Sequence, residues 1–291
     1  MKKTIFAFFL IFLLSLTACD ARSSAPDVQQ TPETQAETPL PVDISGLPEG
    51  QCYRQTPYLN PIGISQPDGQ CVWNSKVYSF SNAPGKLGVT DANGNSEALE
   101  LPGAEYIYGV CENGDTLAVL AGADPLFFAG TDDEQSVQAS GDDGHAIYLY
   151  DETGHLTGSI PLAERCADAP YALDSDGTDY FILFSDAAVR VGSDGTQLAK
   201  SGDMGGRLLQ LACADGAVYV CVEGDRIYQT EKVVRLNAQT LEPEAELSCA
   251  GLDVQGMGTA ADGTLLLISG DYLLRPDFAA GTMTAILHWA D

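Results

Sequence analysis

Carboxylates are the side chains of this sequence with the most obvious capacity for chemistry, because 41 Asp and Glu residues stand against 14 Lys and Arg. The segment 124–144 gathers several of them and could collect a hard cation such as Ca²⁺ on oxygen ligands. Its spacing matches no EF-hand loop, so we prefer to interpret it as a solvated acidic insertion. Its acidic residues are Asp132, Asp133, Glu134, Asp142 and Asp143.

A second acidic set, formed by Asp174, Asp176 and Asp179, superficially resembles a calcium loop. The sixth position, counted from Asp174, is Asp179, where an EF-hand loop requires glycine, and the bidentate glutamate is absent. The set contains an Asp-Gly pair, and similar pairs recur along the chain between apolar segments. We therefore predict a hairpin turn here and no metal ion.

The sequence contains three histidines, His145, His155 and His288. No third nitrogen or carboxylate ligand follows the sequence spacing of a metal site with the first two. We expect His145 and His155 to be surface residues. The chain contains no G-x-S-x-G, no phosphate-binding G-x-x-x-x-G-K, and no carboxylate pair that can be told from turn aspartates. The sequence therefore predicts no catalytic residue, metal ion or cofactor.

The eight cysteines lack the C-x-x-C spacing of zinc and thioredoxin-like sites. Cys111 and Cys213 occupy the same position of a repeat described below, which predicts that both act as small core residues. Cys52 and Cys71 are the best candidates for a disulfide. Seven cysteines follow Cys19, so at least one of them is unpaired in any disulfide scheme.

The net charge of −27 excludes one class of partner. Nucleic-acid binding relies on Lys and Arg that neutralise phosphates, and this chain has few of them. The same charge opposes electrostatic adhesion to anionic lipid. We interpret it as a device for solubility outside the cell, and a cation-binding surface is the alternative.

The N-terminus holds the most specific motif. Two lysines precede an apolar stretch at 5–16, which is too short to span a membrane comfortably and is typical of a signal peptide. The sequence Leu16-Thr17-Ala18-Cys19 resembles the lipobox of bacterial lipoproteins. By that resemblance residues 1–18 are removed and Cys19 receives a diacylglyceryl group. In the alternative interpretation the chain has an ordinary secretory signal and Cys19 is incidental.

Residues 19–45 begin with Cys19 and continue in Pro, Gln, Thr, Glu and Ser, with almost no large apolar side chain. This composition predicts a disordered linker, since it cannot bury enough apolar surface to fold. Residues 46–291 form the predicted folded domain. We therefore expect an extracytoplasmic protein that is attached to the cell membrane by the lipid on Cys19.

The folded domain is a repeat of strands. In the stretch 208–241, apolar residues alternate with polar ones between turns, which is typical of antiparallel hairpins. Two series of turns, such as Asp176-Gly177 with Asp194-Gly195, recur together about every 40 residues. Four short strands per repeat is the size of a β-propeller blade. The all-β alternative is a β-sandwich, which does not require this double period.

Five repeats can be counted after a possible extra strand at 51–60. Either the ring has five blades, or further blades are missing from the chain, and we expect the second case, because an open ring leaves a blade face uncovered. The fold class is therefore all-β, a β-propeller of about five four-stranded blades that is possibly incomplete. The predicted units are 63–103, 104–162, 163–203, 204–251 and 252–288.

Several segments carry a resemblance to the N-terminal part of a group of lipoproteins from clostridial-type bacteria. The resembling segments are Leu16–Cys19, Ile147–Gly154, Val233–Thr240 and Gly281–Trp289. Members of that group have a lipobox, a polar linker and a propeller-like region, followed by an extracellular solute-binding domain that serves ABC importers. The resemblance implies a role beside solute uptake. The present sequence stops at Asp291 without a solute-binding domain, so we expect a truncated gene or a small propeller.

The preferred functional hypothesis is a membrane-anchored binding or scaffold module that is not an enzyme. Its partners would be membrane lipid, through acylated Cys19, and an unknown protein, glycan or small-molecule ligand. One alternative is a propeller hydrolase or lyase with an acidic site on loops over the central channel. A further alternative is an outer-membrane assembly lipoprotein.

Overall fold

The structure is a computed structural model of the 291-residue chain. Residues 1–41, with the predicted lipidation site Cys19, and the acidic segment 124–144 lie outside the described residues. No helix of the described residues is long and apolar enough to cross a membrane. The described residues are 42–43, 53–54, 68–82, 85–91, 93–99, 101, 106–122, 145–162, 170–225, 229–249, 252–260 and 262–290.

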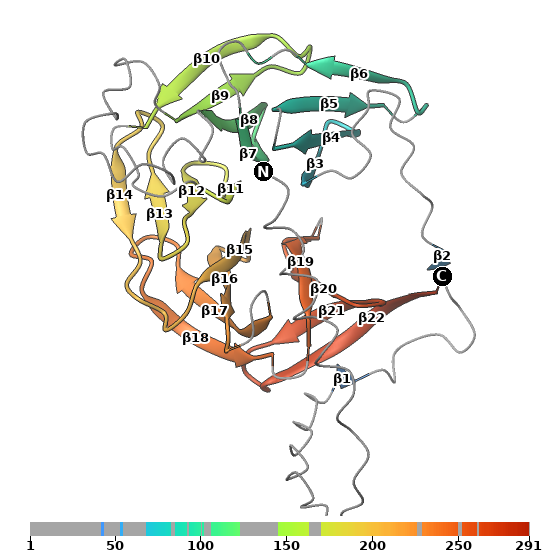
Figure 1. Ribbon diagram of the computed structural model, residues 1–291, viewed down its shortest axis with the longest axis vertical. Coiled ribbons are helices and arrows are strands. Elements are labelled where there is room, and N and C mark those ends of the chain that lie inside the picture. The colour runs from blue at the N-terminus through green and yellow to red at the C-terminus, as the bar shows by residue number, and fades with distance from the viewer. Residues whose placement is uncertain are drawn as a thin grey trace, which may run out of the picture. The chain divides into compact units, whose positions relative to one another are not determined.

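Five antiparallel sheets of four consecutive strands stand in a ring and form a five-bladed β-propeller (Figure 1). Blade 1 consists of β3 (Gly69–Trp73), β4 (Lys76–Ser81), β5 (Lys86–Thr90) and β6 (Ser96–Leu99). Blade 2 consists of β7 (Tyr106–Asn113), β8 (Thr116–Gly122), β9 (Ala146–Tyr150) and β10 (Leu156–Pro161). Blade 3 consists of β11 (Ala172–Ser175), β12 (Tyr180–Leu183), β13 (Ala188–Val191) and β14 (Gln197–Lys200).

Blades 4 and 5 continue the same order. Blade 4 consists of β15 (Leu208–Ala214), β16 (Ala217–Glu223), β17 (Thr230–Asn237) and β18 (Pro243–Ser248). Blade 5 consists of β19 (Val254–Thr259), β20 (Leu265–Ser269), β21 (Tyr272–Asp277) and β22 (Thr282–Ala290). The predicted propeller and its five repeats are confirmed, and the sandwich alternative is not.

The hairpin turns lie at the positions that the sequence predicted. Gly177 has a φ of 88° and Asp215 a φ of 48°, values at which glycine and short polar residues are favoured. The Asp176 carboxylate accepts hydrogen bonds from the backbone N–H groups of Thr178 at 2.9 Å and Asp179 at 2.8 Å. Both bonds reach the same carboxylate oxygen, and such side-chain capping is typical of an aspartate in a turn. The prediction of a hairpin turn at Asp176-Gly177 is confirmed.

The core is divided into four hydrophobic clusters, and each lies between two neighbouring blades. Tyr78 of blade 1 packs with Ile107 of blade 2, and Leu120 of blade 2 packs with Ile182 of blade 3. The remaining two clusters join blade 3 to blade 4 and blade 4 to blade 5. Among the described residues, no cluster joins blade 5 to blade 1.

Two short strands from the N-terminal side pair with the last strand of blade 5. β1 (Val42–Asp43), at the end of the predicted linker, and β2 (Tyr53–Arg54), inside the expected extra strand, both run parallel to β22. This pairing attaches residues from both ends of the sequence to one blade. The hypothesis that further blades are missing from the chain stays a prediction.

Candidate binding site on the loop face of blades 3 and 4

The connections between strands lie on two faces of the ring, because successive strands run in opposite directions. Tight turns join the first strand to the second and the third to the fourth in every blade. We call this the turn face. The connections from the second to the third strand and from one blade to the next lie on the opposite side, which we call the loop face.

A cavity of ≈ 580 Å³ opens on the loop face between blades 3 and 4. Two connections form it, the one from β12 to β13 and the one from β14 to β15. Its volume is within the usual range of small-molecule sites. The lining residues are Ser185, Asp186, Ala187, Lys200, Ser201, Gly202, Asp203, Gly206 and Arg207.

Charges of both signs line this cavity. The Lys200 ammonium lies 3.9 Å from an Asp186 carboxylate oxygen, and 51% and 68% of the two side chains are exposed. A pair this open to solvent is weak and can exchange its partner for a ligand. Asp203 accepts a hydrogen bond from the Gly205 N–H at 2.8 Å through one oxygen.

Arg207 is held at the edge of the cavity by Tyr171. Its Nη2 donates to the Tyr171 hydroxyl at 3.0 Å, and its guanidinium carbon lies 5.0 Å from the centre of the ring. The Tyr171 side chain is 43% exposed although it is large and aromatic. An exposed aromatic ring beside a cation offers a ligand both stacking and charge contacts.

Glycines shape the cavity wall. Gly205 has a φ of 83°, which other residues rarely adopt. A Cβ atom on Gly206 would lie 2.3 Å from the carbonyl oxygen of Glu223, so no larger residue fits without moving the backbone. No motif in the sequence predicted this site. Its only sequence signal is a Gly-rich connection flanked by Lys200 and Arg207 in a chain with few cations.

The three aspartates that superficially resemble a calcium loop serve separate structural roles. Asp174 accepts hydrogen bonds from the N–H groups of Cys213 at 2.7 Å and Ser175 at 2.8 Å, and the first of these bonds links blade 3 to blade 4. Burial raises the pKa of Asp174 to about 6. Within the described part of the chain, no group of three or more His, Cys, Asp or Glu side chains could hold a metal ion.

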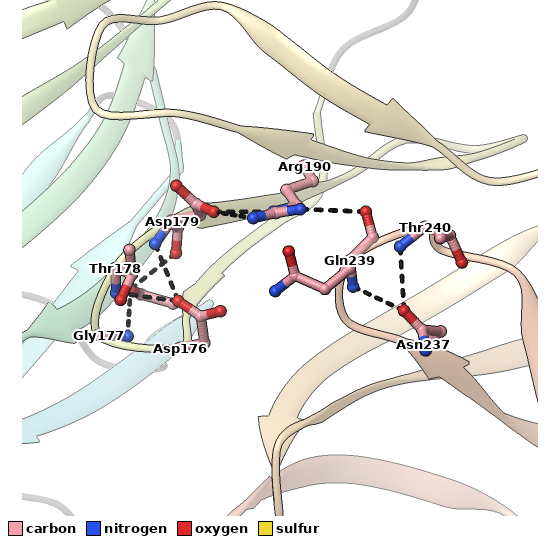
Figure 2. A network of polar contacts seen from close by, with 9 residues as sticks. Asp176, Gly177, Thr178, Asp179, Arg190, Asn237, Gln239 and Thr240 are labelled. Atoms are coloured by element: carbon pink, nitrogen blue, oxygen red, sulfur yellow. Dashed lines mark hydrogen bonds and ion pairs between the residues drawn. The ribbon is translucent and has the colours of Figure 1, made fainter.

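Asp179 belongs to a network that also joins blades 3 and 4, on the turn face (Figure 2). Arg190 of β13 donates through Nε to the Asp179 carboxylate at 2.8 Å and through Nη1 to the Gln239 carbonyl at 3.0 Å. Only 15% of the Arg190 side chain and 11% of the Asp179 side chain are exposed. The network therefore stabilises the junction between blades 3 and 4, and Asp179 is engaged in it by an ion pair with Arg190.

The histidines lie apart. His145 is buried beside Tyr108, with ring centres 5.1 Å apart, and burial lowers its pKa. The expectation of a surface residue at His145 is wrong, because its ring packs against Tyr108, which belongs to the cluster between blades 2 and 3. His155 is exposed in a turn, as expected, and His288 stacks on Tyr272 at 4.7 Å in blade 5.

The cysteines that the structure describes are buried or half-buried. Burial raises the pKa of both Cys111 and Cys213, which pack in or against the core as predicted. The prediction that these two occupy the same position of the repeat is wrong. Cys111 lies two residues before the end of β7 and faces the following blade, whereas Cys213 lies one residue before the end of β15 and faces the preceding blade.

Cys71 is a free thiol in the structure, and Cys52, its expected disulfide partner, lies outside the described residues, so that pairing stays a prediction. Burial, with Glu112 and Asp174 nearby, raises the pKa of Cys71 to about 12. A raised pKa disfavours the thiolate, which is the reactive form of a cysteine.

Comparison with known proteins shows the fold class of this chain but no family or activity. No protein-family profile and no curated protein matches the chain. Virginiamycin B lyase from Staphylococcus aureus is similar in structure, with a TM-score of 0.51 and 14% identity over 77% of this chain and 71% of that one. The nidogen/laminin complex gives a TM-score of 0.55 and 12% identity over 77% and 79%. The allergen Mala s 1 of Malassezia sympodialis gives 0.53 and 11% over 75% and 77%. At these identities the similarity shows a shared β-propeller fold.

Proposed function

We propose that this protein is a lipid-anchored, extracytoplasmic binding module whose propeller holds a small polar ligand in the cavity between blades 3 and 4. This proposal rests on the cavity of ≈ 580 Å³, whose lining combines two cations, Lys200 and Arg207, with the carboxylates of Asp186 and Asp203. The module does not catalyse a reaction on its ligand. Its place beside a solute importer rests on the resemblance to clostridial-type lipoproteins.

The charge pattern suggests the ligand class. A ligand with one anionic and one cationic group can pair with Lys200 on one side and with the carboxylate of Asp186 on the other. A simple anion would be repelled by a chain with a net charge of −27, whereas a zwitterion is not. Free amino acids and short peptides are zwitterions of suitable size.

The ligand experiment is a thermal-shift screen of the mature chain against free amino acids and dipeptides. We expect a zwitterion to raise the melting temperature, because it binds only the folded state. N-acetylated, C-amidated versions of the compounds with uncharged side chains carry no charge and should have no effect. Lys200→Gln should abolish the shift, whereas Lys232→Gln, which alters an exposed pair on blade 4, should preserve it. An equal shift in both variants would place the ligand elsewhere.

The anchor is tested separately. Replacing Cys19 by Ala should move the protein from the membrane fraction into the medium, because acyl chains supply the membrane affinity of an anionic chain. Labelling with an alkyne-modified fatty acid should mark the parent and not the variant. Turnover of a glycan or peptide by the purified protein would instead favour the hydrolase or lyase alternative.

A further inference from the structure

The N-terminal side of the chain runs along β22, the last strand of blade 5. β1 extends the sheet of blade 5 beyond β22 in parallel, with Val42 opposite Met283. β2 pairs with the same strand in the same direction, with Tyr53 opposite Trp289 (Figure 1). The earlier residue therefore lies near the start of β22 and the later residue near its end.

The start of β22 fixes the side on which the chain enters the propeller. Thr282, the first residue of β22, directly follows the turn from β21, and that turn belongs to the turn face. Val42 lies opposite the second residue of β22, and the two strands are parallel. The backbone that leads into Val42 therefore reaches blade 5 at its turn-face edge. The chain comes to the loop-face end of β22 only at Tyr53.

The cavity of the proposed ligand lies on the other face. It opens on the loop face between blades 3 and 4. Along β22, the pairings at Met283 and Trp289 are separated by about 20 Å at the usual rise of a strand. The point where the chain enters and the mouth of the cavity are therefore on opposite sides of the ring.

We propose that the turn face of the propeller lies toward the membrane and that the cavity opens away from it. This inference rests on the proposed lipid anchor at Cys19, because residues 20–41 then connect the bilayer to β1. For the disordered linker that the sequence predicts, the flexible-chain relation gives a mean span of about 25 Å. That span is comparable to the separation of the two faces, so the face that carries the attachment point decides which side is nearer the bilayer.

The charge of the chain favours the same orientation. A net charge of −27 repels a bilayer that contains anionic lipids. A body that is repelled from a surface and held by one tether turns its attachment point toward that surface. The attachment point is the turn-face edge of blade 5, so the loop face is kept on the far side. The cavity is then open to solutes that arrive from the medium.

Energy transfer from single dyes to the bilayer tests this orientation. The sample is the full-length lipidated chain in vesicles of phosphatidylcholine and phosphatidylglycerol with an acceptor-labelled lipid. The donor is attached through an azido amino acid that replaces Ala280 on the turn face of blade 5 or Asp271 on its loop face, both exposed. We expect stronger transfer from position 280, because it should lie closer to the bilayer by up to about 20 Å. Thr240 and Asp225, exposed on the turn and loop faces of blade 4, provide a second matched pair.

A double variant tests whether β1 sets the orientation. Val42→Pro with Asp43→Pro removes the N–H groups that β1 can donate, and proline disfavours strand pairing. The first fixed point of the chain then becomes Tyr53 at the loop-face end of β22. We expect the difference in transfer between positions 280 and 271 to vanish or reverse, with unchanged far-ultraviolet circular dichroism.

Two results would overturn the orientation while leaving the anchor intact. One is equal transfer from positions 280 and 271 in the parent, and the other is an unchanged difference in the proline variant. Failure of the parent to float with the vesicles would instead contradict the lipid anchor of the proposed function, and the orientation with it.

Discussion

Two neighbouring leucine-like side chains on β20 have opposite environments. Leu267 is 0% exposed in the cluster between blades 4 and 5, and Ile268 is 38% exposed on the opposite face of the same sheet. Their chemistry is almost the same, and their backbones are equally extended and paired. Only the presence of a neighbouring blade differs. The comparison shows that in a repeat protein burial is a property of the junction and not of the residue.

The largest effect should come from shortening these two side chains in turn. Leu267→Ala removes buried atoms and leaves a cavity, so we expect it to lower the free energy of unfolding by about 2–5 kcal/mol. Ile268→Ala should cost no more than about 1 kcal/mol, because most of its environment is solvent or sheet surface. Urea unfolding of both variants measures the difference. Equal losses would show that the two faces are buried alike.

A polar link of a packed junction should give the next largest effect. Arg190→Met removes the cation between blades 3 and 4 and leaves the Asp179 carboxylate with 11% exposure and no ion pair. We expect a loss of about 2–3 kcal/mol, below the value for fully buried pairs. Lys232→Met breaks an exposed pair with Glu246 on one blade and should cost less than about 1 kcal/mol. If both variants lost the same stability, the junction network would have no special role.

The smallest effect concerns the pH dependence of the same junction. Burial raises the pKa of Asp174 from its ordinary 3.8 to about 6, so between these values the folded state holds a proton that the unfolded state has lost. This contribution to stability is complete below pH 3.8 and is lost as the pH rises through about 6. Asp174→Asn should remove that loss, which we expect to be on the order of 2 kcal/mol.

Urea unfolding of the parent and of Asp174→Asn at pH 4 and pH 6.5 measures this difference. The turn aspartates titrate alike in both proteins, so their opposite contribution cancels. Several of them, such as Asp91 and Asp151, have pKa values that hydrogen bonds lower. Parallel pH profiles would show that the junction does not titrate in this range.

The blade boundaries were predictable because their causes are local. The Asp176-Gly177 turn needs only a short polar residue and a glycine, which readily adopts the positive φ of such turns. Alternation of apolar residues in β15 and β16 likewise needs no distant contact. The same reasoning correctly predicted that Cys111 and Cys213 pack in or against the core, but it missed the one-residue offset that turns them toward opposite sides of their blades.

The site was not predictable for the opposite reason. The cavity joins Asp186 and Arg207 from two connections of different origin, and no spacing rule relates them. The Arg190 contact with the Gln239 carbonyl spans 49 residues and depends on how blade 4 lies against blade 3. The burial of His145 and the free thiol of Cys71 also depend on packing between elements.

The amino-acid sequence alone determined the all-β class, the repeat of four strands, the five blades and the turns, because these follow from side-chain alternation and turn chemistry within short segments. Only the tertiary structure decided which face of each blade is covered. It also decided where a cavity forms and which carboxylates are used in junctions. These properties arise where separate blades meet, and no contact within a single blade specifies them.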